Sequence, residues 1–364
     1  MHRFATNYAP LMTSFLVKET MIFRNDPVVI FDIGARGGVG REWDVLGDQL
    51  RAYAFEPDEE ECRRLAANAP AHLTYIPKAL GKSSGSQTLY WTSLPDSAGL
   101  YRTRMDYFNR LLNRDNGVTV REGKVNVTSL DEVVAEYKIA TVDFIKLDIE
   151  GAELDVLQGG QNFLRGQLPL GLLSEIRFHE EINGSPPFSE FDAYLRGQGL
   201  RLYDLQFYYQ SRAVMPYPGL QHYHRPNGTK FFAYTSRGQL QDGDALYFRD
   251  LLLPSGAPLI DSMPASAILK MCVFMEIFSM NDCAAELLLA SRERIDAVVD
   301  INRLLNLLAS GICGFPITFR DYTERYFKEP TPTLQNPLTL EVPPAAPENA
   351  TMGQWLRRIV RGGR

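Results

Sequence analysis

The segment Val142–Gly160 constrains the fold of this chain more than any other part of the sequence. Its apolar run, VDFIKLDI, is typical of a buried strand and delivers two acids, Asp148 and Glu150, to the point where the strand ends. A glycine follows at once, and then a helix-forming run from Ala152 to Gln158. Because ligands bind beyond the carboxyl ends of strands in open α/β sheets, this segment predicts a ligand-binding α/β protein.

A second strand of this kind lies near the N-terminus. Val28–Phe31 reads as a buried strand and runs into DIGARGG, which begins at Asp32. The next predicted strand, Arg51–Phe55, ends in Glu56-Pro57. An acid at the end of the second strand is the usual partner of a ribose diol. Two strand ends of this type in one chain favour an enzyme that binds a nucleoside.

The spacing of the glycines narrows the choice of nucleoside ligand. Gly34 is followed by Ala35, Arg36 and Gly37, so the dinucleotide pattern GxGxxG is not present. This argues against a nicotinamide dehydrogenase, which we keep as the remaining alternative. The pattern D-x-G-x-x-x-G, with an acid about 20 residues further on, predicts an adenosine ligand without a pyrophosphate.

Four motifs, FDIGARGG, AFEP, TSLDEVV and VDFIKLDIEGAELDVLQGG, resemble the FkbM-type S-adenosylmethionine-dependent methyltransferases. The resemblance spans Val28–Thr235, and its last motif is the most specific. It implies a class I methyltransferase fold, which is a Rossmann-like, doubly wound α/β sheet of seven strands with the last strand antiparallel. One departure is Arg36, where the family usually has Asn, although an arginine can pair with the methionine carboxylate.

The resemblance also implies which residues bind the donor. Asp32, Gly34, Ala35 and Arg36 would lie along the methionine moiety, Glu56 would bind the ribose hydroxyls beside Pro57, Ala79 and Leu80 would flank the adenine, and Asp148 and Ile149 would lie beside the methionine amine and the acceptor.

Transfer of a methyl group to a hydroxyl needs a group that manages the proton, either a base or a metal. Asp148, Glu150 and Glu175 are expected at the ends of neighbouring strands, and three carboxylates can hold Mg²⁺, which prefers oxygen ligands. Alternatively, Asp148 contacts the donor and Glu150 caps the following helix. Mg²⁺ is therefore a possible second cofactor beside S-adenosylmethionine.

His179, which follows the fifth predicted strand, is the first candidate for the general base, acting beside Asp148. His222 and His224, in the motif QHYHRPNG, are the alternatives. Arg177 could bind an acidic acceptor or pair with a neighbouring glutamate.

The pattern divides the chain into five regions. They are an N-terminal helical segment (1–27), the methyltransferase domain (28–237), a helical extension (238–329), a Pro-rich linker (330–350) and a basic amphipathic tail (351–364). Arg201–Tyr209 and Lys230–Thr235 are expected to close the sheet as an antiparallel pair. Ser97–Gly123 reads as an irregular excursion, and Ala245–Leu253 reads as a helix.

Composition restricts the class of partner. The net charge of -6 argues against nucleic acid as an obligate partner. The four cysteines form no CxxC pair, so neither a zinc site nor a disulfide framework is expected.

The sequence shows no signal peptide and no apolar run of the length of a membrane span, which predicts a cytoplasmic protein. The tail, with its basic and apolar faces, predicts a weak contact with a membrane or a protein, whereas the oligomeric state is left open.

The most plausible acceptor is a hydroxyl of a sugar, a glycan or a glycosylated natural product, because such families often modify these groups. Methylation of nitrogen or of a carboxylate is the alternative reaction. A different class of protein, a non-catalytic adenosine-binding scaffold, would have no need of the acids Asp32, Glu56 and Asp148 around a donor.

Overall fold

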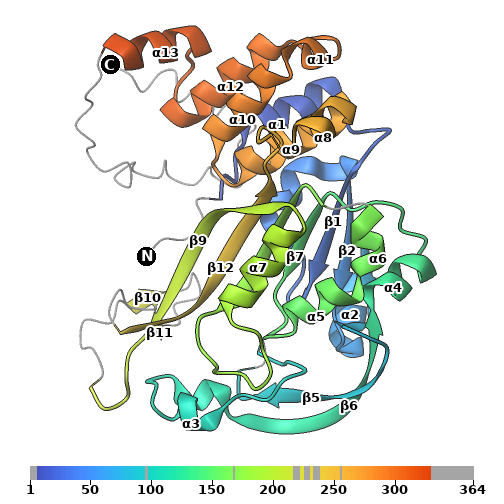
Figure 1. The fold of residues 1–364 in the computed structure, drawn as a ribbon, viewed down its shortest axis with the longest axis vertical. Helices are drawn as coiled ribbons and strands as arrows, with labels where there is room; N and C mark the ends of the chain where they lie inside the picture. The colour runs from blue at the N-terminus through green and yellow to red at the C-terminus, as the bar shows by residue number, and fades with distance from the viewer. Residues whose placement is uncertain are drawn as a thin grey trace.

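The computed structural model describes residues 6–94, 97–166, 169–215, 222–224, 230–232, 238–254 and 256–328. A central sheet has a layer of helices at one end and a smaller sheet at the other (Figure 1). The central strands are β1 (Val28–Ile33), β2 (Leu50–Phe55), β3 (Leu73–Ile76), β7 (Phe144–Leu147), β8 (Gly171–Arg177), β9 (Leu200–Gln210) and β12 (Gln239–Arg249). The predicted linker and tail lie outside the described residues.

The order of the strands is β3-β2-β1-β7-β8-β12-β9. Strands β3, β2, β1, β7 and β8 are parallel, and β12 is antiparallel to both of its neighbours, β8 and β9. The chain order reverses between β1 and β7, which is the switch point where doubly wound sheets bind ligands. The predicted class I, doubly wound sheet of seven strands with the last antiparallel is confirmed.

The helix predicted at Ala245–Leu253 is wrong, because residues 245–249 belong to β12, which lies between β8 and β9. Residues 245–248 are all fully buried, and a strand covered on both faces loses the alternation that distinguishes it from a buried helix. Residues 230–232, the described part of the segment Lys230–Thr235, do not pair with β9, whose partner is β12. Instead, β11 (Lys230–Phe232) pairs with β10 (His222–His224). The start predicted for the helical extension, residue 238, therefore precedes the last strand of the sheet.

A three-stranded sheet lies beyond the carboxyl ends of β1, β2 and β7 (Figure 1). Its strands are β4 (Ala79–Gly81), β5 (Gly85–Thr92) and β6 (Thr119–Ser129), in the order β4-β6-β5. The segment Ser97–Gly123, predicted as irregular, contains α3 (Met105–Phe108) and a 3₁₀ turn at Arg114–Gly117, and its last residues start β6. We call this three-stranded unit the inserted sheet.

The two faces of the central sheet have separate cores, as β1 shows. Val28 and Ile30 contribute to one core, whereas Phe31 and Ile33 contribute to the other, because successive side chains of a strand point to opposite faces. The second core includes side chains of helices α4 (Leu130–Glu136), α5 (Glu153–Gly159) and α7 (Phe188–Gly197). The helices that flank the central sheet are α2 (Glu59–Ala66), α4 (Leu130–Glu136), α5 (Glu153–Gly159), α6 (Gln161–Gly166) and α7 (Phe188–Gly197).

The N-terminal segment and the C-terminal helices form one layer with a common core, which includes Met12, Leu16, Phe144, Phe274 and Leu304. This helical layer consists of α1 (Leu11–Phe15), a π turn (Leu16–Thr20), a 3₁₀ segment (Arg41–Gln49), α8 (Ala257–Ser262), α9 (Ala265–Ile277), α10 (Asn281–Ala290), α11 (Arg292–Asp296), α12 (Ile301–Cys313) and α13 (Phe319–Lys328).

Two buried ionic side chains of α9 join this layer together. Glu276 is fully buried and accepts hydrogen bonds from Met12 N (2.9 Å), Thr13 N (2.7 Å) and Thr13 Oγ1 (2.7 Å) at the start of α1. Lys270 donates to Asp26 (2.8 Å) and to Asp143 (3.0 Å), next to β1 and β7. Helix α9 is therefore bonded both to α1 and to the segments that precede β1 and β7.

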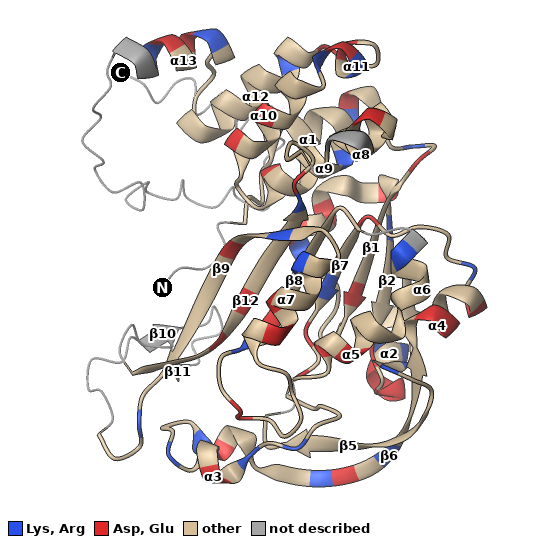
Figure 2. Cartoon of the chain, viewed as in Figure 1, with Lys and Arg blue, Asp and Glu red and all other residues tan. Residues whose placement is uncertain are grey.

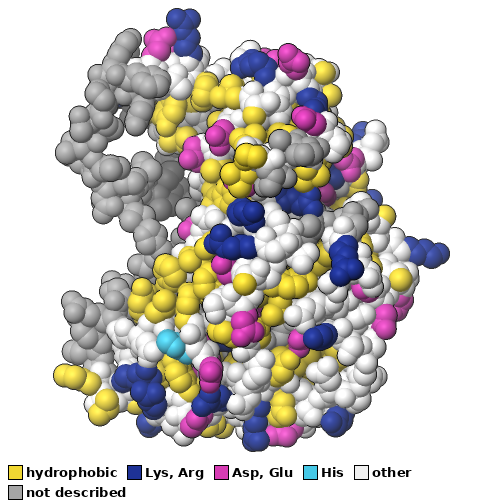
Figure 3. All heavy atoms as spheres, in the orientation of Figure 1, with side chains coloured by type: hydrophobic (Ala, Val, Ile, Leu, Met, Phe, Trp, Pro, Cys, Tyr) yellow, Lys and Arg dark blue, Asp and Glu magenta, His cyan; other side chains and the backbone are white. Residues whose placement is uncertain are grey.

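The surface carries both charges and exposed apolar groups. Lys and Arg are interspersed with Asp and Glu along the ribbon (Figure 2). Leu289, Val298 and Phe315 of the helical layer are exposed. On the face shown in Figure 3, hydrophobic side chains are interspersed with charged ones. Within the described part of the chain, none of the helices has both the length and the apolar character that crossing a bilayer requires.

Replacement of Glu276 by Gln should destabilise the protein. Both carboxylate oxygens of Glu276 accept hydrogen bonds from buried donors of α1, whereas an amide has only one oxygen that can accept. Hydrogen bonds to a charged group contribute about 1.5–3 kcal/mol, and we expect a loss of this order in the free energy of unfolding. Urea unfolding followed by circular dichroism would measure it. The exposed Glu286 of α10 offers a control, Glu286→Gln. Equal stability of both variants would contradict the bonding role of Glu276.

Candidate active site

A cavity of about 230 Å³ lies where β1, β2 and β7 end, between these strand ends and the inserted sheet. Its walls come from the strand ends on one side and from β4, β5 and the segment 98–100 on the other. The lining residues are Ile33, Gly34, Arg36, Phe55, Glu56, Pro57, Asp58, Lys78, Ala79, Leu80, Leu89, Trp91, Ala98, Gly99, Leu100, Lys146, Asp148, Ile149, Glu150 and Ala152.

The loop after β1 passes directly against the end of β7. Gly34 has a φ of 90°, and a Cβ at this position would lie 1.9 Å from the backbone oxygen of Asp148. The N–H groups of Gly34 and Ala35 both donate to the carbonyl of Phe55, at 3.1 and 3.0 Å. Only glycine can occupy position 34, since any side chain would collide with the neighbouring strand. The close approach shapes this end of the cavity.

Lys146 connects the ends of β1 and β7, and the sequence reasoning missed it. Its Nζ lies 3.3 Å from Asp32 Oδ1 and 3.3 Å from Asp148 Oδ2, and it donates to the carbonyl of Gly34 at 3.2 Å. Burial acts to lower the pKa of Lys146, but the two carboxylates outweigh it and raise the pKa above its usual range. The lysine is therefore charged, and it holds Asp148 at the cavity wall. A lysine within a buried strand was the available signal.

Glu56 presents its carboxylate to the cavity from the end of β2. The residue is buried, and its Oε1 accepts a hydrogen bond from Asp58 N at 2.8 Å. Burial raises the pKa of Glu56, while the bond from Asp58 opposes this shift. Arg36 lies beside it and forms an ion pair with Asp58 at 3.6 Å. The acid is thus fixed in position and oriented by the backbone.

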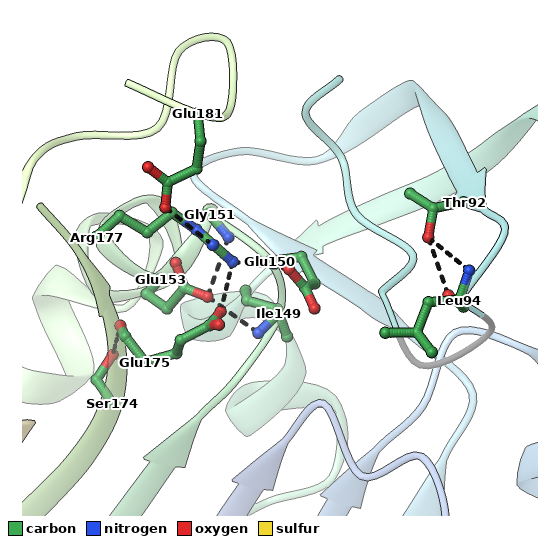
Figure 4. A network of polar contacts seen from close by, with 10 residues as sticks. All are labelled: Thr92, Leu94, Ile149, Glu150, Gly151, Glu153, Ser174, Glu175, Arg177 and Glu181. Atoms are coloured by element: carbon green, nitrogen blue, oxygen red, sulfur yellow. Dashed lines mark hydrogen bonds and ion pairs between the residues drawn. The ribbon is translucent and has the colours of Figure 1, made fainter. Parts of the chain in front are cut away.

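An acidic cluster surrounds Arg177 next to the cavity (Figure 4). The same guanidinium nitrogen donates to Glu150 at 2.7 Å and to Glu175 at 2.6 Å, and a second nitrogen donates to Glu181 at 3.4 Å. Burial raises the pKa of Glu150 to about 7 and that of Glu181 to about 7, although the positive charge of Arg177 opposes both shifts. Burial also raises the pKa of Glu175 well above its usual range.

The structure brings together the three predicted metal ligands. One carboxylate oxygen from each of Asp148, Glu150 and Glu175 lies within 4.8 Å of the others. However, Arg177 already bonds to two of the three. Its guanidinium supplies the positive charge that a cation would bring, and a metal would have to displace it. This arrangement gives no support to Mg²⁺ as a second cofactor.

Glu150 stands on a strained turn between β7 and α5. Its φ is 61°, which is uncommon for a residue with a side chain, and Gly151 follows with a φ of 106°. The side chain of Glu153 secures the turn, because its Oε1 accepts from Ile149 N (3.0 Å) and Gly151 N (3.1 Å). Strain of this kind persists where neighbouring contacts enforce it, and it gathers at functional sites. Glu153 was not identified from the sequence.

His179 is not among the residues that line the cavity. Its Nε2 lies 2.7 Å from the carbonyl oxygen of Leu240 and 2.8 Å from Nε2 of Gln239, and its ring stacks on Tyr107 with 5.9 Å between centroids. Its role as a base stays a prediction. The side chains of the two alternative bases, His222 and His224, lie outside the described residues.

Most of the residues predicted to bind the donor lie in the cavity wall. The lining includes Gly34, Arg36, Glu56, Pro57, Ala79, Leu80, Asp148 and Ile149. Asp32 and Ala35 are buried behind it, where Asp32 pairs with Lys146. The apolar side of the inserted sheet, Leu89 and Trp91, was not assigned to the site from the sequence.

Comparison with known families identifies the central part of the chain. Residues 32–202 match the model of the methyltransferase FkbM domain. The resemblance drawn from the four motifs is thereby confirmed for this segment, which matches the FkbM domain model over slightly less than half of the chain. The segment contains every residue predicted to bind the donor.

The chain is also similar to the hexuronic acid methyltransferase AglP of Haloferax volcanii, with 28% identity over 140 residues. The match covers 38% of this chain and 52% of AglP, so the chain spans about half the length of this curated relative.

Among solved structures, a Pyrococcus horikoshii protein named as an RNA methyltransferase has a TM-score of 0.26 and 10% identity, with coverage of 66% of this chain and 84% of the other. TehB of Haemophilus influenzae has a TM-score of 0.30 and 9% identity, with coverage of 66% and 67%. Likenesses this low carry no weight here.

The contact between Gly34 and Asp148 predicts the effect of a single methyl group. In Gly34→Ala the new Cβ must displace the end of β7, so we expect a loss of about 1–3 kcal/mol in stability and no measurable binding of S-adenosylhomocysteine. Calorimetry and thermal unfolding would measure both. Gly197→Ala in α7, where a Cβ meets nothing within 4 Å, is the matched control. A Gly34→Ala variant that binds as tightly as the wild type would separate this loop from the site.

Proposed function

We propose that this chain is an S-adenosylmethionine-dependent methyltransferase that acts on a hydroxyl of a sugar. The observation that carries the proposal is the cavity at the ends of β1, β2 and β7, which lies within the FkbM domain and is lined by Glu56 and Asp148. An acid at each of these two strand ends, with glycine between them, suits a nucleoside that carries a positively charged amine.

The residues present fit such a donor. Because Gly34 has no Cβ, the loop after β1 packs against the backbone of Asp148, and both residues line the cavity. We assign the ribose hydroxyls to Glu56, the amine to Asp148, and the adenine to the apolar pair Ala79 and Leu80. Bound S-adenosylmethionine would supply a methyl group that its sulfonium has already activated. Lys146 holds Asp148 in position through an ion pair at 3.3 Å, and the inserted sheet excludes water from one side.

Two observations favour a sugar hydroxyl as the group that accepts the methyl. AglP, the relative that matches over 140 residues, is named as a hexuronic acid methyltransferase, which favours a sugar. In addition, carboxylates such as Asp148 and Glu150 at one end of the cavity can accept hydrogen bonds from sugar hydroxyls. Methylation of nitrogen or of a carboxylate remains the alternative reaction, and a non-catalytic scaffold would bind donor without any transfer.

The hydroxyl that accepts the methyl group must lose its proton to a general base. His179 is our first candidate for the base, acting beside Asp148. Glu150 is a second candidate, because it lines the cavity whereas His179 does not. The carboxylate of Glu150 is held by Arg177 at 2.7 Å, and its pKa of about 7 suits proton transfer near neutral pH.

The assignment of the ribose predicts the behaviour of Glu56→Gln. Loss of the charged acceptor should weaken binding of S-adenosylhomocysteine by about 1.5–3 kcal/mol, measured by calorimetry. Glu59→Gln, at an exposed position three residues later, should bind like the wild type. If both variants bind equally well, Glu56 does not hold the ribose.

The two candidate bases can be separated by rate measurements with labelled S-adenosylmethionine and a panel of hexuronic acid and neutral hexose glycosides. Replacement of the true base, in His179→Asn or Glu150→Gln, should lower turnover by about 10²–10⁴-fold and leave donor affinity unchanged. If Glu150 is the base, the wild-type rate should rise as the pH passes about 7, because the group accepts protons only when ionised.

A chelator arm of the same assay tests the role of Arg177. Because this guanidinium already balances the acids, turnover should survive EDTA. Loss of turnover in EDTA, with recovery in Mg²⁺, would show instead that the carboxylates hold a metal. Transfer to none of the sugars by a protein that binds donor would refute a sugar acceptor.

A further inference from the structure

The inserted sheet forms the wall of the cavity opposite the strand ends, and its contribution differs along its length. Ala79 and Leu80 of β4 lie at one end of this wall, and Trp91 of β5 lies at the other. Both strands pair with β6, where Ala79 is opposite Val127 and Trp91 is opposite Arg121. Six residues of β6 separate the two positions, which is about 20 Å of strand.

Trp91 lies toward the acidic end of the cavity. Its neighbour Tyr90 forms two backbone hydrogen bonds with Gly99, at 2.9 and 3.1 Å. Gly99 in turn packs on Glu150, since a Cβ on Gly99 would lie 3.0 Å from Glu150 Cβ. This chain of contacts places the end of β5 beside Glu150 and far along the wall from the apolar pair that we assign to adenine.

The indole of Trp91 is fixed on its outer side. The guanidinium of Arg121 lies over the ring, 3.7 Å from its centroid. Gly123 lies along the ring edge, because a Cβ there would be 3.0 Å from the indole Cζ3. Arg121 is not among the residues that line the cavity, whereas Trp91 is. A cation therefore covers one side of the indole, and the cavity meets the ring elsewhere.

We propose that Trp91 is the platform on which the sugar acceptor stacks, with Asp148 and Glu150 accepting hydrogen bonds from its hydroxyls. The C–H face of a pyranose is apolar and carries slight positive charge, which complements the electron-rich face of an indole. The hydroxyls around the ring edge need acceptors, and the two carboxylates supply them. One aromatic face with acids beside it suits a sugar ring better than a purine, whose ring edge offers few donors. The proposal rests on the proposed function and specifies the acceptor site.

Trp91→Ala should raise KM for the glycoside by about tenfold, which corresponds to the contribution of one stacked ring. The kcat should stay within about twofold, because Trp91 does not touch the reacting atoms, and the Kd of S-adenosylhomocysteine should be unchanged. Trp91→Phe should restore most of the affinity. The assay uses labelled S-adenosylmethionine with methyl glycosides of hexuronic acids and of neutral hexoses. Tyr90→Ala is the matched control, since Tyr90 belongs to the same strand but does not line the cavity.

The outcomes separate this inference from the proposed function. If the wild type transfers methyl to a glycoside and Trp91→Ala has an unchanged KM, the sugar does not stack on Trp91 and the inference is overturned. If Trp91→Ala weakens binding of S-adenosylhomocysteine instead, Trp91 belongs to the donor and the inference is overturned. If the wild type binds S-adenosylhomocysteine but methylates no glycoside, the sugar acceptor itself fails, and this inference fails with it. Binding to S-adenosylhomocysteine by each variant also reports that it is folded.

Discussion

The charge of Lys146 is the interaction on which the geometry of the strand ends depends. It binds three oxygens from two strands, those of Asp32, Asp148 and the Gly34 carbonyl. Asp32 is buried, and a buried carboxylate without a cation would be strongly destabilising. With Lys146 in place, the loop after β1 can lie against the end of β7, and Asp148 is directed toward the cavity. The shape and the charge of this end of the cavity therefore have one origin.

Much of the fold follows from the sequence because the pattern of the strands is local. The strands that end at Asp32, Glu56 and Asp148 are short apolar runs followed by glycine or a helix cap, and each of these signals lies within a few residues. Strand β12 escaped recognition because its apolar residues 245–248 face covered surfaces on both sides, which removes the alternation. The start of β6 was not recognised, since it lies in the polar segment Ser97–Gly123, whose strand character depends on pairing with β5.

In the candidate site too, the features that depend on neighbouring residues could be predicted, whereas those that depend on contacts between distant segments could not. The residues of the motifs could be placed because each motif fixes its own turn. The partner of the three carboxylates could not be derived, because it depends on how the side chains of two neighbouring strands meet. From the sequence, Asp148, Glu150 and Glu175 have the composition of a metal site, whereas in the structure Arg177 binds two of them. The sequence also could not predict that Trp91 lines the cavity, since its position is set by the pairing of β5 with β6.

The position of β12 has a consequence for the order in which the protein can assemble during synthesis. The strand is inserted between β8 and β9, so these two strands have no partner on their facing edges until residue 249 has left the ribosome. The N-terminal helix α1 waits longer, because its first N–H groups are bonded by Glu276. Contacts that join such distant parts of a chain form slowly and leave apolar surface exposed meanwhile. The protein therefore completes its sheet and its helical layer only after most of the described chain has been made.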